Sequence, residues 1–279
     1  MYIEKNTIIK RYGQKPMVVD TFYNPEIKKQ PIIIFSHGYK GFKDWGAWNI
    51  MAKTIAKSGF CFLKFNFSHN GGTVENPIDF PDLKAFGNNN YTKEINDLGD
   101  VINWSIDKFE NNSAIDTTKI YLIGHSRGGG ITVLKTAEDN RIKKLVTLAS
   151  VCDFEKRTAT FGNLEQWKKD GVKYVTNGRT KQQMPHYYQF YEDFIKNKDN
   201  LNIKSACKKI NVPHLIIHGE SDTSIAVSEA ENLNHWNPKS QLNIIKGANH
   251  VFNVKHPWTE KSVPKEFKAM MNASINFLK

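Results

Sequence analysis

The segment that decides the fold is YLIGHSRGGGITVL, residues 121–134 of a 279-residue chain. Its first residues form a short apolar run that is typical of a buried strand, and a helix is predicted after Ser126. Ser126 stands between Gly124 and Gly128, so a polar hydroxyl follows directly on that strand. Two interpretations are open at this point. The segment is either a tight turn made of small residues or a backbone bent to present the hydroxyl.

The residues around Ser126 fit the Gly-x-Ser-x-Gly pattern, which has meaning only between a strand and a helix. A strand is predicted over 119–124 and a helix from Arg127 onward. In such a turn the serine is strained, and Gly124 and Gly128 must be small so that strand and helix can approach each other. The hydroxyl then lies at a helix N-terminus, where the amides and the dipole favour negative charge. We therefore interpret Ser126 as a candidate nucleophile.

Strands and helices alternate along the rest of the chain. Such alternation predicts an α/β fold with a mostly parallel, twisted sheet of about eight strands and helices on both faces. Functional residues in such sheets gather at the carboxyl ends of the strands. Strands are expected near 8–9 and over 16–22, 31–38, 60–67, 119–124, 143–150, 214–218 and 242–246, and helices over 45–59, 91–109, 127–140 and 264–279.

One region, residues 151–209, interrupts this alternation because it contains no clean strand. It is rich in aromatic residues and is predicted to be mostly helical near HYYQFYEDFIKN, residues 186–197. No Gly/Ser-rich linker flanks it. We therefore expect residues 1–279 to form a single domain, with 151–209 as a small lid or cap inserted over one end of the sheet.

The chain carries a formal net charge of +11, and only five of its 39 basic residues are arginines. Proteins that read nucleic-acid sequence rely on arginine and cluster their charge, whereas the lysines here are scattered. We therefore expect a solvated, lysine-rich surface and no specific nucleic-acid partner. A weak attraction to anionic substrates or polymers stays open.

The three cysteines, Cys61, Cys152 and Cys207, are widely separated, and their odd number argues against a disulfide framework. We interpret them as small buried hydrophobic residues. No apolar run approaches the roughly 20 residues that cross a bilayer, and the N-terminus lacks the apolar region of a signal peptide. We expect a cytoplasmic monomer or homodimer with no membrane partner, although a secreted chain whose signal had been removed would look the same.

A serine hydroxyl needs a base, and the base needs an orienting carboxylate. In this architecture the acid and then the histidine follow the serine along the chain. Asp222 directly follows the strand predicted over 214–218, and His250 follows the strand predicted over 242–246. We predict that His250 is the base and Asp222 its orienting acid. Glu220 is a close rival for the acid.

Acyl transfer also needs donors for the developing oxyanion. The amide of Arg127 is one candidate, and the amide of Tyr39, after the His37-Gly38 turn, is the second. Because the backbone would supply both donors, we expect the Tyr39 and Arg127 side chains to be replaceable. No group of residues has the spacing of metal ligands, so we predict no metal and no cofactor.

Four motifs, HGYKG, GHSRGG, HGESD and GANHVF, together resemble the α/β-hydrolase superfamily. Within it the chain resembles the serine esterases related to dienelactone hydrolases, a group that includes cinnamoyl and feruloyl esterases. The resemblance covers residues 16–279 and includes a lid after the sixth strand. Two features depart from the pattern: the nucleophile is Ser126 where dienelactone hydrolases use cysteine, and NFSHNG, residues 66–71, replaces an Asp-x-x-Gly-x-Gly-like turn.

The resemblance implies a serine hydrolase that cleaves short-chain or aryl carboxylic esters through an acyl-enzyme. Its partner would be a small-molecule ester, and the aromatic insertion would form an apolar acyl or aryl pocket. A peptidase, an acyltransferase or a thioesterase on the same scaffold stays open, since these reactions share the triad. A binding protein that keeps the fold without catalysis is the alternative from another class.

Overall fold

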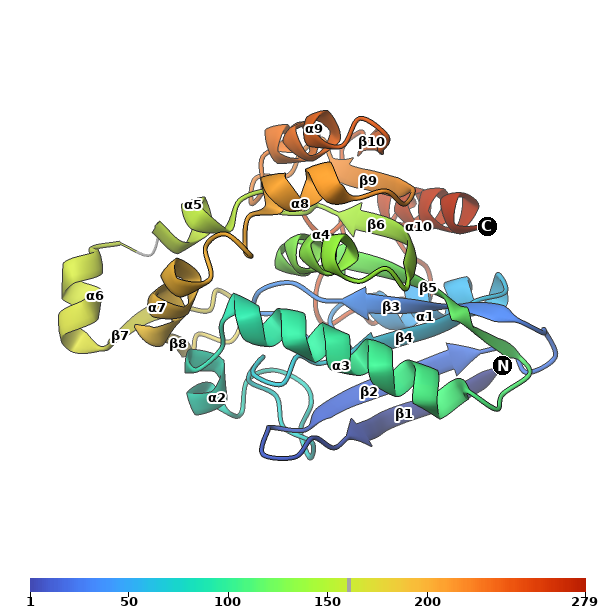
Figure 1. Cartoon of the computed structure of the whole chain (residues 1–279), viewed down its shortest axis with the longest axis horizontal. Helices are drawn as coiled ribbons and strands as arrows, with labels where there is room; N and C mark the ends of the chain where they lie inside the picture. The colour runs from blue at the N-terminus through green and yellow to red at the C-terminus, as the bar shows by residue number, and fades with distance from the viewer. Residues whose placement is uncertain (160–161) are drawn as a thin grey trace.

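The computed structural model describes residues 1–159 and 162–279 and is built around an eight-stranded sheet (Figure 1). The strand order is β1-β2-β4-β3-β5-β6-β9-β10, and every pair from β4 to β10 is parallel. The predicted mostly parallel sheet is therefore confirmed. The strands are β1 (Tyr2–Ile9), β2 (Met17–Tyr23), β3 (Gln30–Ser36), β4 (Cys61–Phe65), β5 (Ile115–His125), β6 (Ile142–Leu148), β9 (His214–Gly219) and β10 (Gln241–Ile245).

The antiparallel part of the sheet lies at one edge, where β1 pairs with β2 and β2 pairs with β4. Ile8 lies opposite Val18 and Ile9 opposite Met17, so the two strands expected near 8–9 and over 16–22 pair with each other. β2 is buried along its whole length, whereas β1 is mostly exposed. The edge of the sheet is therefore formed by β1, and β2 already belongs to the core.

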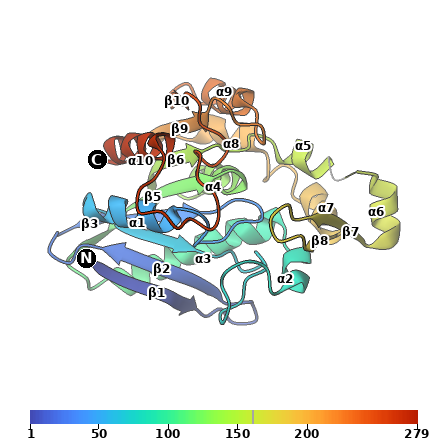
Figure 2. The ribbon, with the colours of Figure 1, turned by 180° about the vertical axis from the view of Figure 1, so that it is seen from behind.

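Helices cover both faces of the sheet, as Figures 1 and 2 show from opposite sides. Side chains that point to one face of the strands, such as Ile32 and Leu122, pack with α3, α4, α8 and α9. Their neighbours Ile33 and Ile123 point to the other face and pack with α1 and α10, as the period of two in a strand requires. These helices are α1 (Trp48–Lys57), α3 (Tyr91–Phe109), α4 (Arg127–Glu138), α8 (Ile203–Lys209), α9 (Val227–Trp236) and α10 (Lys265–Leu278).

The predicted insertion follows β6 and lies beyond the carboxyl ends of the strands (Figure 1). Residues 160 and 161 of it lie outside the described residues. The expectation that it contains no strand is wrong, because Val172–Thr176 (β7) and Gln183–Tyr187 (β8) form an antiparallel hairpin. Met184 of β8 packs with Phe42 and Phe86, so tertiary contacts stabilise a strand that no local period indicates. The helix expected near residues 186–197 is present. The helices of the insertion before α8 are α5 (Phe154–Ala159), α6 (Leu164–Asp170) and α7 (Gln189–Lys196).

The segment between β4 and α3, for which the sequence indicates no regular element, contains the short helix α2 (Leu83–Gly87), which packs against β8. Its N-cap is Asp82, whose carboxylate accepts a hydrogen bond from the Ala85 amide. The N-cap of α3 is Asn90, whose side-chain oxygen accepts a hydrogen bond from the Lys93 amide, and Thr92, a candidate cap by residue type, does not serve as one. The Thr92 hydroxyl instead donates to Asp193 of α7 at 2.7 Å and so ties α3 to the insertion.

A buried ion cluster anchors the loop between β3 and α1. Asp20 of β2 accepts from Lys64 of β4 at 2.7 Å and from Lys43 of the loop at 2.9 Å, and all three side chains are at most 1% exposed. Lys64 also contacts Asp44 at 2.6 Å, and Lys5 reaches Asp20 from the edge strand. We call these five residues the Asp20 cluster. It joins residues 43 and 44 of the loop to β1, β2 and β4.

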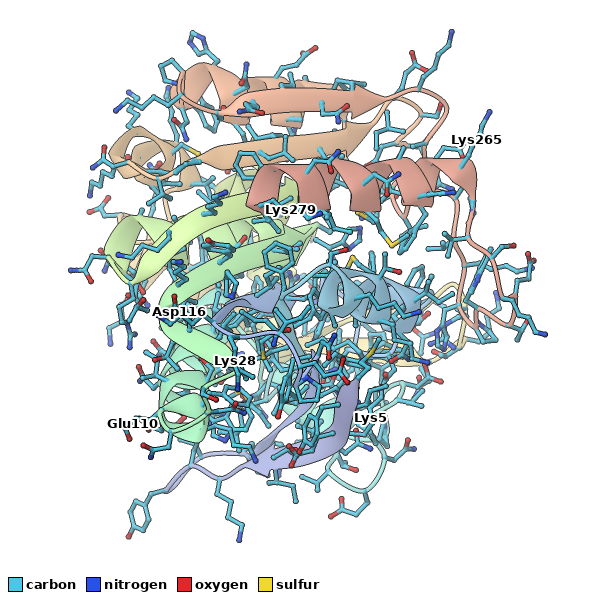
Figure 3. All side chains as sticks on the ribbon, turned by 90° about the vertical axis from the view of Figure 1, so that its right-hand side faces the viewer. Lys5, Lys28, Glu110, Asp116, Lys265 and Lys279 are labelled. Atoms are coloured by element: carbon cyan, nitrogen blue, oxygen red, sulfur yellow. The ribbon has the colours of Figure 1, made fainter. Side chains whose placement is uncertain are left out.

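Figure 3 looks onto the end of the sheet at which the parallel strands begin, where Lys28 precedes β3, Glu110 follows α3 and Asp116 lies near the start of β5. The three cysteines are free and buried, as predicted from their spacing. None of the helices in the described ranges is long and apolar enough to cross a membrane.

Candidate active site

Ser126 lies at the sharp turn between β5 and α4, with backbone angles φ 57° and ψ −120°. A positive φ is rare for a residue with a Cβ, and it indicates local strain that the surrounding structure must hold. The flanking glycines explain how this is possible. A Cβ on Gly124 would come within 2.3 Å of the Gly128 carbonyl oxygen, and a Cβ on Gly128 within 2.4 Å of the His37 carbonyl oxygen. Only glycine fits at either position, which agrees with the steric reason inferred from the sequence.

The structure brings Ser126, His250 and Asp222 together from three separate loops. The His250 Nε2 atom lies 3.1 Å from the Ser126 Oγ atom, and the His250 Nδ1 atom lies 2.8 Å from an Asp222 carboxylate oxygen. A carboxylate only accepts, so Nδ1 carries the proton and Nε2 is left as the acceptor for the serine hydroxyl. The tautomer required of a general base is thus fixed by its neighbour.

Asp222 is held by four donors. The amides of Ser224 and Ile225 donate to its Oδ1 atom at 2.8 and 2.9 Å, and the His218 Nε2 atom lies 3.2 Å from its Oδ2 atom, beside His250. His218 Nε2 also faces the Ile225 carbonyl oxygen at 3.0 Å, so this nitrogen must carry the proton. Burial acts to raise the pKa of Asp222, but the hydrogen bonds from His218 and His250 outweigh it and hold the pKa well below its usual range. Asp222 therefore stays ionised.

The rival acid, Glu220, does not reach this group. It is exposed and accepts a hydrogen bond from the Gly247 amide at 3.0 Å, in the loop after β10. His218, like His37 and His125, is expected from its place beside a glycine at a strand end to pack or hydrogen-bond a loop, and the structure also makes it a neighbour of the acid. The sequence places His218 beside a glycine at a strand end, and nothing in that pattern indicates that its ring reaches Asp222 four residues later.

The two predicted oxyanion donors flank Ser126. The Ser126 amide is already bonded to the Leu148 carbonyl oxygen at 2.9 Å, whereas no acceptor for the amides of Tyr39 or Arg127 occurs in 1–159 or 162–279. Gly38, which precedes Tyr39, lies so close that a Cβ on it would come within 2.9 Å of the Ser126 Cβ atom. The arrangement of the two turns is therefore consistent with the expectation that the amides of Tyr39 and Arg127 are the oxyanion donors.

The side chains of Tyr39 and Arg127 have specific partners, although the sequence assigns a role only to their backbone amides. The Tyr39 hydroxyl lies 2.8 Å from the His186 Nε2 atom of β8, so it links the loop to the insertion. The Arg127 guanidinium stacks on the Tyr39 ring at 4.4 Å and contacts Glu94 of α3 at 3.4 Å. Sequence reasoning missed Glu94, because 33 residues separate it from Arg127 and no motif contains it.

Two further histidines hold the site in shape. The His37 Nδ1 atom faces the Gly38 carbonyl oxygen at 2.9 Å, and the His125 Nε2 atom faces the His250 carbonyl oxygen at 2.9 Å. Burial lowers the pKa of His37 to about 4 and the pKa of His125 to about 3. Both rings are therefore neutral at physiological pH and serve as fixed hydrogen-bond donors, which agrees with the structural roles expected for them.

Two cavities meet at Ser126, with volumes of about 200 and about 220 Å³. We call the first the Arg127 cavity and the second the His250 cavity. The Arg127 cavity is lined by Tyr39, Tyr91, Ser126, Arg127, Val151, Phe154, Arg157 and Ile225. The His250 cavity is lined by His37, Gly38, Tyr39, Lys40, Gly41, Trp45, Trp48, His125, Ser126, His250 and Val251.

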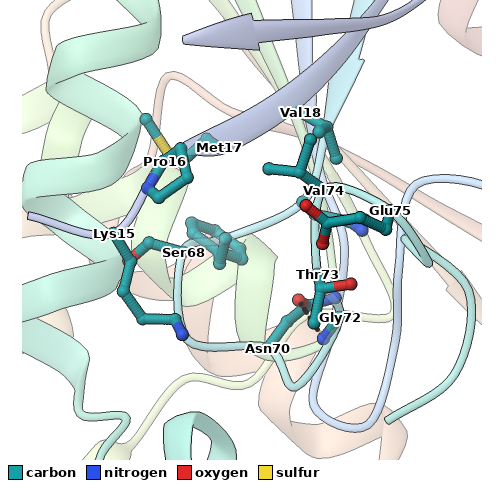
Figure 4. Close-up of a pocket in the computed structure, with 12 residues that line it drawn as sticks. Lys15, Pro16, Met17, Val18, Ser68, Asn70, Gly72, Thr73, Val74 and Glu75 are labelled. Atoms are coloured by element: carbon teal, nitrogen blue, oxygen red, sulfur yellow. Dashed lines mark hydrogen bonds between the residues drawn. The ribbon is translucent and has the colours of Figure 1, made fainter. Parts of the chain in front are cut away.

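A third cavity, of about 220 Å³, lies between the segment 15–18 and the loop that follows β4 (Figure 4). Neither Ser126 nor His250 lines it. Two of its polar groups are engaged elsewhere, because the Ser68 hydroxyl donates to Asp97 and the Asn70 amide donates to the Gly41 carbonyl oxygen. The Asn70 contact shows what the departing NFSHNG segment does, which is to brace the loop that carries Tyr39.

Metal chemistry was not expected from the sequence. Across the described ranges, no three His, Cys, Asp or Glu side chains are grouped so that they could hold a metal ion. The polar centre of the site is therefore the hydrogen-bonded series Ser126, His250 and Asp222.

The family model that matches this sequence is BD-FAE, and the match spans residues 19–237. The chain belongs to the BD-FAE family. The match includes Ser126 and Asp222 but ends before His250. The predicted resemblance to α/β hydrolases of the cinnamoyl and feruloyl esterase type is confirmed.

Solved structures share the fold over nearly the whole chain. Est1E from Butyrivibrio proteoclasticus with bound ferulic acid has a TM-score of 0.74 and 18% identity, over 98% of this chain and 97% of that one. DcsB in complex with its substrate analogue has a TM-score of 0.73 and 17% identity, over 99% of both chains. The α/β hydrolase GrgF from Penicillium sp. sh18 has a TM-score of 0.70 and 17% identity, over 100% of this chain and 98% of that one. The predicted α/β-hydrolase fold is thereby confirmed.

A curated relative from Escherichia coli is described as an uncharacterized 31.7 kDa protein in the traX-finO intergenic region. It is 28% identical over 145 residues, which are 48% of this chain and 42% of that protein. The chain therefore matches less than half the length of this relative.

Proposed function

We propose that this protein is a serine hydrolase that cleaves carboxylic esters through an acyl-enzyme on Ser126. The observation that carries the proposal is the continuous hydrogen-bond path from the Ser126 hydroxyl through His250 to Asp222, with distances of 3.1 and 2.8 Å. Activation of a hydroxyl by a base that a buried carboxylate orients is the arrangement on which nucleophilic acyl transfer depends. The fold shared with Est1E, whose solved structure contains ferulic acid, is consistent with this reaction.

In the first half of the reaction, His250 takes the Ser126 proton at Nε2 as Oγ attacks the ester carbonyl carbon. The carbonyl oxygen gains the negative charge and accepts hydrogen bonds from the amides of Tyr39 and Arg127. His250 then donates the proton to the leaving alkoxide, and the ester C–O bond breaks. Asp222 stays ionised throughout and stabilises the imidazolium that forms between the two proton transfers.

In the second half, a water molecule takes the place of the leaving alcohol. His250 removes its proton, the hydroxide attacks the acyl carbon, and a second oxyanion forms at the same two amides. Its collapse releases the carboxylic acid and returns the proton to Ser126. The strained backbone at Ser126 supports this cycle because it holds Oγ at the start of α4, clear of competing hydrogen bonds within the helix.

The two cavities suggest how an ester would lie. His250 must protonate the leaving group, so the alcohol side belongs in the His250 cavity, where Trp45 offers an aromatic wall. The acyl side then belongs in the Arg127 cavity, which Tyr91, Val151 and Phe154 line. Volumes of about 200 Å³ suit short acyl or single-ring groups better than long chains.

The proposal is tested with chromogenic esters of increasing acyl size. Ser126→Ala should lose turnover by about a million-fold, and Asp222→Asn by roughly ten-thousand-fold, because the histidine then loses its oriented tautomer. Ser113→Ala, an exposed serine near the start of β5, is the matched control and should behave as the wild type. Substantial turnover by Ser126→Ala would refute the assignment of the nucleophile. Turnover confined to peptide or thioester substrates would assign a different reaction to the same site.

A further inference from the structure

Arg127 is a charged group beside the nucleophile for which the proposed reaction uses only the backbone amide. Its side chain is buried, and its guanidinium lies 4.4 Å from the Tyr39 ring centroid, 5.3 Å from that of Tyr91 and 5.6 Å from that of Phe190. Stacking against three rings fixes the plane of the guanidinium without using its N–H donors. The head group is thus held rigidly at the wall of the Arg127 cavity.

The counter-charge of Arg127 is incomplete. Glu94 meets it through a single contact, from its Oε1 atom at 3.4 Å, and not through the paired, short contacts of a bidentate arginine–carboxylate bridge. The same Oε1 atom accepts from the Asn89 amide at 2.7 Å, and Glu94 Oε2 has no partner in the part of the chain that the structure describes. The pair therefore leaves both donors and positive charge of Arg127 available to a third group.

A second guanidinium, that of Arg157, lines the same cavity. It is about one-third exposed and is held by Glu229, whose other oxygen accepts from the Cys152 amide at 2.9 Å. The remaining walls are apolar, from Tyr91, Val151 and Phe154. An apolar cavity with arginine side chains on its wall suits an acyl group with a hydrocarbon body and an anionic terminus.

We propose that the acyl subsite selects acyl groups that end in a carboxylate, so that the preferred substrates are monoesters of dicarboxylic acids. This inference rests on the proposed function, because it takes Ser126 as the nucleophile and the Arg127 cavity as the acyl side. Arg127 is the main receptor for the carboxylate, and Arg157 supports it from the same wall. The planar guanidinium fits a planar carboxylate, and the existing partners Glu94 and Glu229 disfavour a doubly charged phosphate group.

Three substrates test the inference: mono-4-nitrophenyl adipate, its methyl ester at the free carboxyl, and 4-nitrophenyl hexanoate. They share the leaving group and the length of the acyl chain, and only the first carries a terminal charge. Adipate is preferred to shorter diacids because its carboxylate does not readily attack its own ester. The measured quantity is the ratio of kcat/KM for the charged ester to that for each neutral ester. For the wild type this ratio should be roughly 10 to 100, the value of one charge-assisted hydrogen bond.

Opposite changes in two variants distinguish a receptor from a merely structural arginine. Glu94→Gln removes the partial counter-charge and should raise the ratio, whereas Arg127→Gln should bring it close to one. Because Arg127→Gln leaves Glu94 buried without its cation, the double variant Glu94→Gln/Arg127→Gln provides a neutral pair of similar volume and should show the same loss. Arg157→Gln should lower the ratio by a smaller factor. Arg141→Gln, an arginine at the start of β6, is the control that should keep the wild-type ratio.

The outcomes distinguish a failure of the carboxylate receptor from a failure of the proposed esterase function. If Ser126-dependent turnover is seen but the wild-type ratio is one or less, the carboxylate receptor is wrong and the esterase stands. The receptor is also wrong if the double variant keeps the wild-type ratio, since Arg127 then only supports the aromatic wall. If no ester is hydrolysed in a way that Ser126→Ala abolishes, the proposed function itself fails.

Discussion

Asp20 and Glu94 are both buried carboxylates beside basic side chains, yet they are partnered very differently. Both Asp20 oxygens are fully used: Oδ2 accepts from Lys5 and Lys64 at 2.7 Å each, and Oδ1 meets the Lys43 ammonium and the Asn6 amide at 2.9 Å each. Glu94 shares one oxygen between Asn89 and Arg127, and its second oxygen has no partner within the described ranges.

This difference separates a structural cluster from a functional one. A buried charge is tolerated when it is fully paired, and then it fixes the position of the elements that supply the partners. The Asp20 cluster does so for the loop that carries Tyr39. The pair of Glu94 and Arg127 is incomplete, and it lies where a substrate would arrive. Unused bonding capacity beside a nucleophile indicates a place for a ligand, whereas the same capacity elsewhere would only reduce stability.

The largest expected effect comes from breaking the complete cluster. Asp20→Asn leaves Lys43 and Lys64 buried around a neutral group, and we expect it to lower the free energy of unfolding by about 3–5 kcal/mol. Chemical denaturation followed by circular dichroism measures this change. The ratio of charged to neutral ester turnover should stay at the wild-type value, since the cluster does not line the Arg127 cavity. A stability loss under 1 kcal/mol would show that the cluster is not the anchor described here.

An intermediate effect is expected from weakening the contact between the loop that carries Tyr39 and the insertion. Tyr39→Phe removes the hydroxyl that bonds to His186 but keeps the ring that stacks on Arg127. We expect a loss of about 1 kcal/mol in the free energy of unfolding, the net value of one hydrogen bond. KM should rise more than kcat falls, because the amide of residue 39 is retained. A loss of kcat with unchanged KM would mean that the hydroxyl acts in the transition state.

The smallest effect is expected from neutralising the incomplete pair. Burial raises the pKa of Glu94 above its usual value even though Arg127 and Asn89 act to lower it. The folded state therefore binds this proton more tightly than the unfolded state does. Glu94→Gln, which resembles the protonated form, should leave the stability at neutral pH unchanged or raise it by up to about 1 kcal/mol. A clear destabilisation would show that the ion pair is complete in solution.

The two carboxylates should also give opposite pH dependences. Burial acts to raise the pKa of Asp20, but Lys64 and Lys43 outweigh it and lower the pKa, so its contribution is present above about pH 4 and is lost on acidification. The raised pKa of Glu94 has the reverse sign, since its contribution is lost as the pH rises above about 4. Denaturation of both variants and the wild type between pH 3 and about pH 7 separates the two trends. Parallel curves for the two variants would contradict the contrast.

The positions of the strands along the chain, the turn at Ser126 and the positions of Asp222 and His250 could be read from the sequence because each lies within a short local pattern. The strands of a parallel sheet all run in the same direction, so the residues that directly follow them lie at the same edge of the sheet. Three motifs spread over 124 residues of the chain therefore predict one location. The structure brings those side chains within hydrogen-bonding distance of each other.

The partners of Arg127 could not be predicted in this way. Glu94 lies in the first turn of α3, whose pattern shows only that one face is buried, and Tyr39 was read for its amide alone. The hairpin β7–β8 was also missed, because its pairing and its contacts with α2 depend on tertiary packing and not on a local period. Contacts between elements decide side-chain roles, and a single sequence carries little information about them.

The central claim is that Ser126 forms a covalent acyl intermediate. Intact-mass measurement after brief mixing with a 4-nitrophenyl ester, followed by peptide mapping, tests it directly. We predict one acyl group per chain on the peptide that contains Ser126, and the same peptide should carry the label of a fluorophosphonate probe. The adduct should be absent from Ser126→Ala. An adduct formed in His250→Ala should persist longer than in the wild type, because the base that activates water is missing. Rapid turnover with no adduct on Ser126, or an adduct on another residue, would contradict the account.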